Sequence, residues 1–166
     1  MTIVPSFVFA LVDGFDSSFL PQRTDPVASG WDVRAAITED LVLEPFQRAL
    51  IPLGFRTLMP AGWWLSLNPR SSTFAKKHLN CLVGVLDESW EGQSMMAVQY
   101  LPVVTSIPTP TTLVCRISPG DKIGQIIPVV RQEMEVQEVS NEGFDRMCKE
   151  RGLKRGAAGF GSSGVK

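Results

Sequence analysis

The chain has little of the residue types on which many common sites depend. It contains three cysteines and one histidine in 166 residues. Cys81, Cys115 and Cys148 are odd in number, widely spaced and without a Cys-x-x-Cys pair, which argues against a disulfide framework and a thiolate zinc site. With His78 alone, a histidine-based metal cluster is impossible and a Ser-His-Asp triad is disfavoured. We therefore expect a reduced, intracellular and cytoplasmic setting.

An excess of one charge and a long apolar run are also missing. The formal net charge is -1 at pH 7, so no basic field attracts duplex nucleic acid. The apolar stretch 3–12 is too short to span a bilayer and has no basic region before it. We expect neither a nucleic-acid nor a membrane partner. A phosphate-rich ligand would have to be held by a few placed cations and backbone amides.

The pattern that is present is that of a β-protein. Proline and glycine recur about every ten residues, and short runs rich in Val, Ile, Leu and Thr lie between them. This spacing favours a sandwich, barrel or jelly roll in one catalytic domain over 1–139. The expected strands are Ile3–Val12, Trp31–Ala36, Leu41–Leu43, Ala49–Pro52, Arg56–Met59, Trp63–Leu67, Met95–Tyr100, Thr112–Ile117 and Lys122–Arg131.

The C-terminal part, 140–166, has a different pattern. A short helix is expected over Ser140–Arg151, capped by Ser140 or Asn141 and stopped by Gly152. Its apolar face is expected to dock on the body of the protein. Glycine and serine dominate the rest of the chain, which is typical of a flexible arm. The apolar face consists of Phe144, Met147 and Cys148.

Three segments carry groups suited to phosphate. Arg70 stands beside Ser71 and Ser72 directly after an expected strand, where a guanidinium can clamp a phosphate while hydroxyls donate to other oxygens. The alternative is a turn with an exposed arginine. Gln125 follows the turn Ser118–Gly124 and can donate an amide to a ligand, although an edge-strand role explains it equally well.

The third segment is Arg155–Gly164. Its glycine density lets the backbone approach a phosphate chain and point N–H groups inward. It lacks the Gly-Lys-Ser/Thr of a Walker A loop, and a linker is the plain alternative. Phe160 between two glycines is unusual for a linker and suits a base-stacking platform.

Two carboxylates also stand out. Asp87 lies in Gly84–Gly92, between two apolar runs in the shape of a hairpin, where it could act as a general base on water. Trp90 offers a flat surface for a sugar or base. A hairpin with a solvated acidic tip is the alternative. Asp32 is a charge within an apolar strand and should meet an arginine, a backbone turn or a hydrated metal.

In this order the segments resemble the five motifs of the trimeric, all-β dUTPase family. The corresponding stretches cover most of the chain. Five motifs in the right order with workable spacing are specific, whereas one alone would be weak. The stretches are Ala28–Val33, Pro69–Ser72, Gly84–Gln93, Gly120–Gln125 and Arg155–Gly164.

The resemblance implies a distorted jelly roll, or β-clip, assembled as a homotrimer whose active sites draw on all three subunits. It implies hydrolysis of dUTP to dUMP and pyrophosphate with Mg²⁺, which Asp32 orients through water. Asp87 would activate the attacking water, and Trp90 would pack on the deoxyribose. The C-terminal arm would cover a neighbouring active site. Further substrate contacts would come from Arg70, Ser71, Ser72, Gly84, Val85, Leu86, Gln125, Arg155, Gly159, Phe160, Gly161 and Ser162.

Several positions depart from the family pattern. Trp90 stands where tyrosine is usual, which may be expected to alter sugar selectivity because the ring is larger. Gly124 replaces the usual alanine, and Lys122 a common arginine. Ala158 replaces a glycine of the arm. None of these changes removes a catalytic group.

Three other functions were weighed. A dCTP deaminase shares the fold and an arginine-serine-serine turn, but it carries a catalytic glutamate in the strand after the hairpin, and Met95–Gln99 has none. A dUTP-sensing regulatory protein, as some phage relatives are, would add a protein partner to the enzyme and place it in a host cytoplasm. A bare structural module leaves Arg70, Asp87 and Phe160 unexplained.

Overall fold

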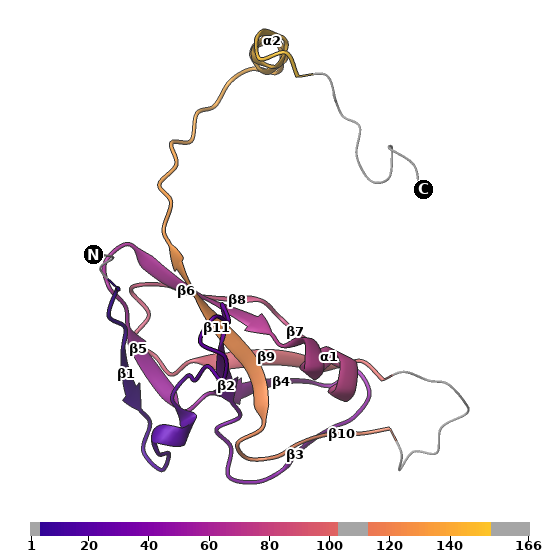
Figure 1. The fold of residues 1–166 in the computed structure, drawn as a ribbon. Coiled ribbons are helices and arrows are strands. Elements are labelled where there is room, and N and C mark those ends of the chain that lie inside the picture. The colour runs from indigo at the N-terminus through magenta and orange to yellow at the C-terminus, as the bar shows by residue number, and fades with distance from the viewer. Residues whose placement is uncertain (1–3, 103–112, 154–166) are drawn as a thin grey trace. The chain divides into compact units, whose positions relative to one another are not determined.

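The computed structural model describes residues 4–102 and 113–153. It is an all-β domain with short helices, as the sequence predicts (Figure 1). The elements are β1 (Val8–Leu11), the 3-10 helix η1 (Ser17–Phe19), β2 (Trp31–Arg34), β3 (Leu41–Leu43), β4 (Arg48–Pro52), β5 (Phe55–Leu58), β6 (Trp63–Pro69), α1 (Ser71–Lys77), β7 (Leu79–Cys81), β8 (Gly84–Leu86), β9 (Met95–Tyr100), β10 (Cys115–Ile117), β11 (Lys122–Val130) and α2 (Asn141–Glu150).

The strands form four antiparallel sheets. A four-stranded sheet has the order β2-β11-β6-β8, and a three-stranded sheet has the order β4-β9-β7. Two pairs, β1-β5 and β3-β10, complete the described strands. Neighbours in each sheet come from distant parts of the chain, so the fold brings separated segments side by side.

The predicted strands are confirmed with small shifts in their ends. The expected strand Ile3–Val12 is shorter, at Val8–Leu11, and Thr112 lies outside the described residues. The sequence prediction missed two short strands, β7 and β8, and the helix α1. Three-residue strands show too little alternation to be recognised, and the polar run Ser71–Thr73 resembles a loop because serine and threonine are common in turns.

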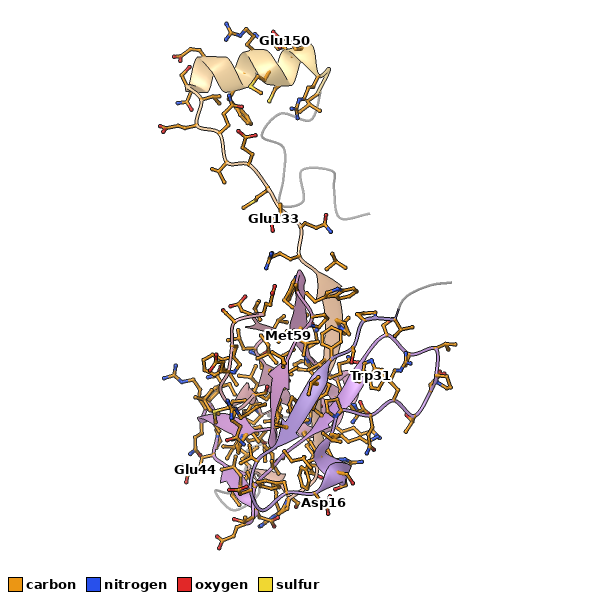
Figure 2. The ribbon with its side chains drawn as sticks, turned by 90° about the vertical axis from the view of Figure 1, so that its left-hand side faces the viewer. Asp16, Trp31, Glu44, Met59, Glu133 and Glu150 are labelled. Carbon is orange, nitrogen blue, oxygen red and sulfur yellow. The ribbon has the colours of Figure 1, made fainter. Side chains whose placement is uncertain are left out.

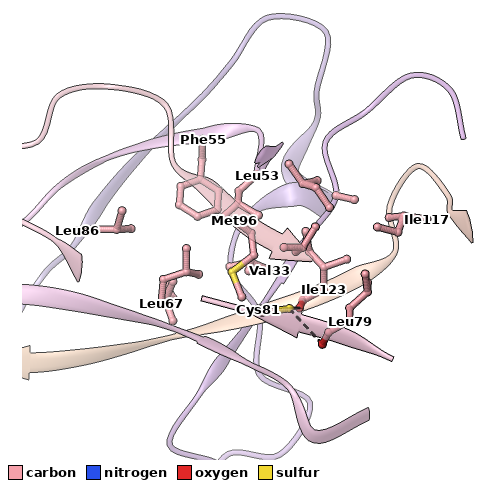
Figure 3. Packing of buried hydrophobic residues seen from close by; sticks show 14 of the residues in the cluster. Val33, Leu53, Phe55, Leu67, Leu79, Cys81, Leu86, Met96, Ile117 and Ile123 are labelled. Atoms are coloured by element: carbon pink, nitrogen blue, oxygen red, sulfur yellow. Dashed lines mark hydrogen bonds between the residues drawn. The ribbon is translucent and has the colours of Figure 1, made fainter. Parts of the chain in front are cut away.

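The core lies between the sheets. Buried apolar side chains alternate along the paired strands, as in Phe55-Arg56-Thr57-Leu58, where the first and third side chains are buried. Figure 3 shows the packing of these residues from both larger sheets. The labelled members are Val33, Leu53, Phe55, Leu67, Leu79, Cys81, Leu86, Met96, Ile117 and Ile123.

Strand β11 organises the four-stranded sheet because it pairs with β2 on one side and β6 on the other. Gln125 lies opposite Asp32 on β2 and opposite Asn68 on β6. Directly opposed residues of antiparallel strands share one face of the sheet. The register therefore aligns three polar side chains in one row across three strands.

The chain divides into two compact units, Met1–Arg131 and Gln132–Lys166. In the second unit, Ser140 caps α2 as predicted, with its side chain accepting a hydrogen bond from the Gly143 N–H. Gly152 follows the helix with φ 68°, a left-handed conformation suited to a stop. Docking of the apolar face of α2 stays a prediction. No helix within the described residues is long and apolar enough to cross a membrane.

Candidate active site

The first part of the site is an ion-paired cluster around Asp32. Its Oδ1 lies 2.8 Å from Arg70 Nε, and its Oδ2 lies 2.8 Å from Lys122 Nζ. Only 16% of the Asp32 side chain is exposed. The arginine partner predicted for this charge in an apolar strand is thus present. The two cations exceed the single carboxylate, which leaves the cluster with a positive charge.

Arg70 is set in place by the junction of β6 and α1. The sequence predicted a turn here, but Arg70 is the last extended residue before the helix, with φ −92° and ψ 146°. Thr73 on the buried side of α1 donates from Oγ1 to the Ile123 carbonyl of β11 over 3.2 Å. This bond fixes α1 against β11. The hydroxyl residues Ser71 and Ser72 are held in the first turn of the helix.

A second tie joins α1 to the turn before β11. Lys77 Nζ lies 2.7 Å from Asp121 Oδ2, which also accepts from the Ser118 N–H over 3.0 Å. Burial opposes the charged form of Asp121, but the hydrogen bonds from Lys77 and Ser118 outweigh it and lower the pKa of the carboxyl. This turn leads directly into the strand that carries Gln125.

These elements enclose a cavity of about 210 Å³, hereafter the phosphate pocket. It brings together five of the predicted site residues from three separate motifs. Arg23 also lies in its wall, and the sequence reasoning missed it because nothing in the local pattern distinguishes this arginine from an exposed loop residue. The lining is Gln22, Arg23, Thr24, Ala28, Gly30, Asp32, Arg70, Ser71, Ser72 and Gln125.

Gly30 is required for the position of Gln125. The Gln125 side chain donates from Nε2 to the Pro69 carbonyl over 3.1 Å. A Cβ on residue 30 would collide with Gln125 Oε1 and would stand 2.7 Å from Gln125 Cδ. The first and fourth motifs therefore meet through a contact that only glycine allows.

The second part of the site is the turn after β8, Asp87–Trp90, hereafter the Asp87 turn. The Trp90 N–H donates to the Asp87 carbonyl over 3.0 Å, which closes the turn. The predicted hairpin is wrong in its pairing: β8 pairs with β6, whereas β9 pairs with β4 and β7. The run from Asp87 to Ser94 crosses between two sheets because its flanking strands have different partners.

Glu88 anchors the Asp87 turn. Its Oε2 accepts from the Gly62 N–H over 2.9 Å and lies 2.7 Å from Arg131 Nη1. These contacts tie the turn to the start of β6 and the end of β11. The sequence reasoning did not single out Glu88 or Arg131, since their meeting depends on the register of β6 with β11.

Asp87 and Val85 line a different cavity, of about 600 Å³, together with Trp63, Trp64, Glu88, Ser89 and Arg131. None of the described residues lines both this cavity and the phosphate pocket. Trp90 is 49% exposed, and its ring occupies the space where a Cβ at Gly92 would stand. A single chain thus places the predicted base and the predicted phosphate contacts in two separate cavities.

Five predicted contacts lie outside the described residues. They are Arg155, Gly159, Phe160, Gly161 and Ser162.

The metal prediction was compared with the donor groups of the phosphate pocket. The described residues contain no group of three or more His, Cys, Asp or Glu side chains placed to hold a metal ion. Both oxygens of Asp32 already face cations. This donor set does not suit direct chelation, but a carboxylate of this kind can accept a hydrogen bond from a water of a hydrated ion.

The cysteines are separate from both cavities. Cys81, Cys115 and Cys148 are free, and the first two are buried. Burial and the neighbouring Cys115 raise the pKa of the Cys81 thiol to about 11. A thiol of this kind stays protonated and behaves as a core residue.

A model of the family described as dUTPase matches residues 16–164. The deoxyuridine 5'-triphosphate nucleotidohydrolase of Ectopseudomonas mendocina is 35% identical over 151 residues, which are 87% of this chain and 87% of the relative. The protein of the same name from Chlamydia pneumoniae is 32% identical over 150 residues, 88% of this chain and 91% of the relative.

Solved structures show the same fold. The dUTPase of Staphylococcus bacteriophage 80alpha, determined with dUpNHpp, has a TM-score of 0.77 at 23% identity and covers 96% of this chain and 99% of its own. The dUTPase from phage phi11 of S. aureus has a TM-score of 0.68 at 21% identity, covering 82% and 97%, and that structure describes a structural Mg(II) ion. The chain therefore belongs to the dUTPase family, and its enzymatic activity is that of a dUTP nucleotidohydrolase.

Proposed function

We propose that this enzyme splits dUTP into dUMP and pyrophosphate by direct attack of water on the α-phosphorus, with Asp87 as the general base. The convergence of Arg70, Ser71, Ser72 and Gln125 in one positively charged pocket carries this proposal. These are the side chains that the motif resemblance assigns to the phosphates.

Each group in the phosphate pocket has donors left for a ligand. Arg70 uses Nε for Asp32, and its Nη1 lies 3.5 Å from the Lys122 carbonyl, so other guanidinium N–H groups remain for phosphate oxygens. The hydroxyls of Ser71 and Ser72 can donate to neighbouring oxygens. Because these donors are fixed before the substrate arrives, they stabilise developing phosphate charge at little reorganisation cost.

Asp87 has the exposure that a base needs. Its carboxylate is exposed, and within the described part of the chain no hydrogen bond to its side chain competes with a water. The water oxygen attacks the α-phosphorus while its proton moves to the Asp87 carboxylate. The bond from the α-phosphorus to the bridging oxygen breaks, and pyrophosphate leaves with that oxygen.

The Asp87 turn also offers the groups to read the base. Strand β8 is at the edge of its sheet, so the backbone of Gly84, Val85 and Leu86 has one side available for hydrogen bonds to uracil. Trp90 follows within reach as the ring that packs on deoxyribose. A tight backbone reading of this kind rejects the methyl of thymine by steric exclusion.

The separation of the two cavities favours an active site shared between copies of the chain. We propose a homotrimer in which the phosphate pocket of one subunit meets the Asp87 turn of a second. The arm of a third would cover the site with Arg155, Gly159, Phe160, Gly161 and Ser162. Water would then be excluded only in the assembled and liganded enzyme.

An exposed apolar face suits this assembly. Leu50 on β4 and Leu82 after β7 are 65% and 68% exposed, and both flank Ala97 of β9. They line a cavity of about 500 Å³ across the three-stranded sheet. Clustered apolar side chains on a surface mark contact with another protein, and a second copy of this chain is the occupant that the divided site requires.

Mg²⁺ belongs to the proposal as an ion carried by the triphosphate. When bound, it would neutralise phosphate charge and favour departure of pyrophosphate. Asp32 would accept a hydrogen bond from one of its waters. The residue cannot act through direct chelation alone, because Arg70 and Lys122 already occupy its oxygens.

Release of pyrophosphate from dUTP, dCTP, dTTP and UTP, with Mg²⁺ present, tests the proposal. We expect turnover of dUTP alone, and a loss of about 100- to 10,000-fold in kcat for Asp87→Asn with dUpNHpp binding retained. Full activity of Asp87→Asn would remove this residue as the base. Release of ammonia from dCTP would instead favour a deaminase, although β9 carries no glutamate.

A regulatory function is a second proposal. The phage 80alpha structures are described in terms of dUTPases that control transfer of virulence genes by a G protein-like mechanism, and this chain shares their fold. A regulatory role would require a protein partner that dUTP displaces. Co-purification with and without dUpNHpp, using the inactive Asp87→Asn variant, separates such binding from hydrolysis.

A further inference from the structure

Arg23 is fixed beside the ion-paired cluster although it lies in a loop. Its neighbour Gln22 forms a two-way bridge with Asp32: the Gln22 N–H donates to the Asp32 carbonyl over 3.1 Å, and the Asp32 N–H donates back over 2.8 Å. The loop therefore runs along the outer edge of β2. Its position is set by the same residue that binds Arg70 and Lys122.

The loop after Arg23 closes on itself. The Ala28 N–H donates to the Asp25 carbonyl over 3.1 Å, and the Val27 N–H donates to Asp25 Oδ1 over 3.0 Å. The guanidinium of Arg23 completes the ring, since Nη1 donates to the Ala28 carbonyl over 3.1 Å. The side chain thus bends across its own loop toward Gly30 and β2.

An aromatic ring holds the other side of this guanidinium. The Arg23 Cζ lies 4.4 Å from the centroid of the Trp31 ring, and Trp31 is labelled on β2 in Figure 2. A cation over an indole face is attracted by the ring, while its N–H edges remain available for hydrogen bonds. Trp31 therefore orients the charge without neutralising it.

Arg23 differs in this respect from Arg70. Asp32 binds Arg70 directly, whereas no carboxylate within the described residues lies within ion-pair distance of Arg23. One of its five N–H groups is used at Ala28. Both arginines line the phosphate pocket. Arg23 is thus a positioned cation whose charge no protein group balances.

We propose that Arg23 is a second phosphate-binding arginine, which contacts the phosphate chain of dUTP from the wall of the pocket opposite the start of α1. The inference rests on the proposed function of the pocket. It adds a residue outside the five sequence motifs to the substrate contacts. A guanidinium held by Trp31 and Ala28 loses little side-chain entropy when a phosphate oxygen binds.

A purely structural role is the competing explanation, because the bond to Ala28 also closes the loop. The two roles differ in their dependence on the ligand. A phosphate contact weakens ligands in proportion to the phosphates that reach Arg23. Loss of the loop would weaken every ligand equally and would lower thermal stability.

The test compares Arg23→Gln and Arg23→Lys with the wild-type full-length enzyme. Calorimetric binding of dUMP, dUDP and dUpNHpp is measured with Mg²⁺ at low and high salt. For Arg23→Gln we expect Kd for dUpNHpp to rise roughly ten- to a hundredfold, the effect of losing a charged hydrogen bond, with a change of less than about threefold for dUMP. Arg23→Lys should recover part of the loss, since it keeps the charge but not the fork geometry.

Arg116→Gln is the matched control, because Arg116 is exposed, pairs with Asp40 and lines neither cavity. It should leave all three dissociation constants unchanged. Equal weakening of dUMP and dUpNHpp with a lower melting temperature, or no change for any ligand, would overturn the proposal. The binding readout does not depend on hydrolysis, so an active Asp87→Asn variant would refute the proposed base and leave the result for Arg23 interpretable.

Discussion

The phosphate pocket and the Asp87 turn are built in opposite ways. In the pocket, Asp32 is largely buried and joined to two cations at 2.8 Å. In the turn, Asp87 is exposed and Trp90 is 49% exposed. One chain completes the ion pairs of the pocket but leaves the base and its aromatic neighbour open. The difference indicates that the turn needs a surface from another subunit, whereas the pocket is ready in one chain.

The physical reason lies in the sheet. Three strands with fixed register define the pocket, and β11 at their centre is bonded on both sides. The Asp87 turn follows an edge strand of three residues. It is held mainly by Glu88, whose carboxylate reaches Gly62 and Arg131. A central strand gives rigid placement, while an edge leaves room for a ligand or a neighbour.

Mixing two inactive variants tests this comparison with the largest expected effect. Arg70→Ala should lower kcat/KM roughly 100- to 1000-fold, as the loss of a preorganised charged donor does. Asp87→Asn should be comparably inactive. If the two cavities meet between subunits, unfolding and refolding the two variants together should form some sites with both native residues, and activity should return to a measurable fraction of wild type.

The double variant Arg70→Ala/Asp87→Asn, refolded alone, controls for recovery by refolding itself. Mass measurement of tagged chains establishes that mixed oligomers form. Mixed oligomers without activity would contradict the shared site, because every chain would then carry one defect within its own active site.

The sequence predicts the pocket better than the turn. Asp32, Arg70 and Gln125 were recognised because a charge in an apolar strand and an arginine before two hydroxyls are visible in short windows. Arg23 and Glu88 were not, because their roles depend on contacts to residues that are distant in sequence, such as Arg131. The long strands were predicted nearly to their ends, but three-residue strands such as β8 gave no periodic signal.

The departure at Gly124 also needed the structure for its explanation. A Cβ at this buried position would stand 3.1 Å from the Met96 methyl, 3.2 Å from the Asn68 carbonyl and 3.3 Å from Val33 Cγ2. In this chain Met96 and Val33 fill the space that the usual alanine would occupy. The substitution is thus compensated by larger neighbours, which no local pattern around Gly124 indicates.

Gly30→Ala should have the next largest effect, and it acts on the pocket alone. The added methyl displaces the Gln125 side chain from its bond to the Pro69 carbonyl. We expect kcat/KM to fall roughly 10- to 100-fold, since one phosphate donor is misplaced while the fold is kept. Steady-state kinetics measure this. Gly62→Ala has no neighbour within 4 Å to collide with, so it controls for loss of a glycine, although its φ of 79° costs some stability.

Glu88→Gln should have a smaller effect, confined to the Asp87 turn. The amide can still accept from the Gly62 N–H, but its charged contact with Arg131 is lost. We expect kcat to fall by less than about tenfold with the Kd for dUpNHpp nearly unchanged, because the base is displaced and the pocket is not. Glu91→Gln removes an acidic side chain from the same segment without touching Arg131. Equal effects of the two changes would show that Glu88 acts only through charge.

Lys77→Met should have the smallest effect, on the acid stability of the pocket's scaffold. Asp121 has a lowered pKa in the folded protein because Lys77 and the Ser118 N–H bind its carboxylate. This stabilisation is present above the unfolded pKa of about 4 and is lost as pH falls through the lower folded value. Since both partners are partly exposed, we expect a difference in unfolding free energy of less than about 1 kcal/mol at pH 7, which shrinks toward zero in acid. Urea unfolding from pH 7 to pH 3 measures it, with exposed Lys76→Met as control. A difference that grew as the pH fell would mean that Lys77 stabilises the turn by packing and not through the carboxylate of Asp121.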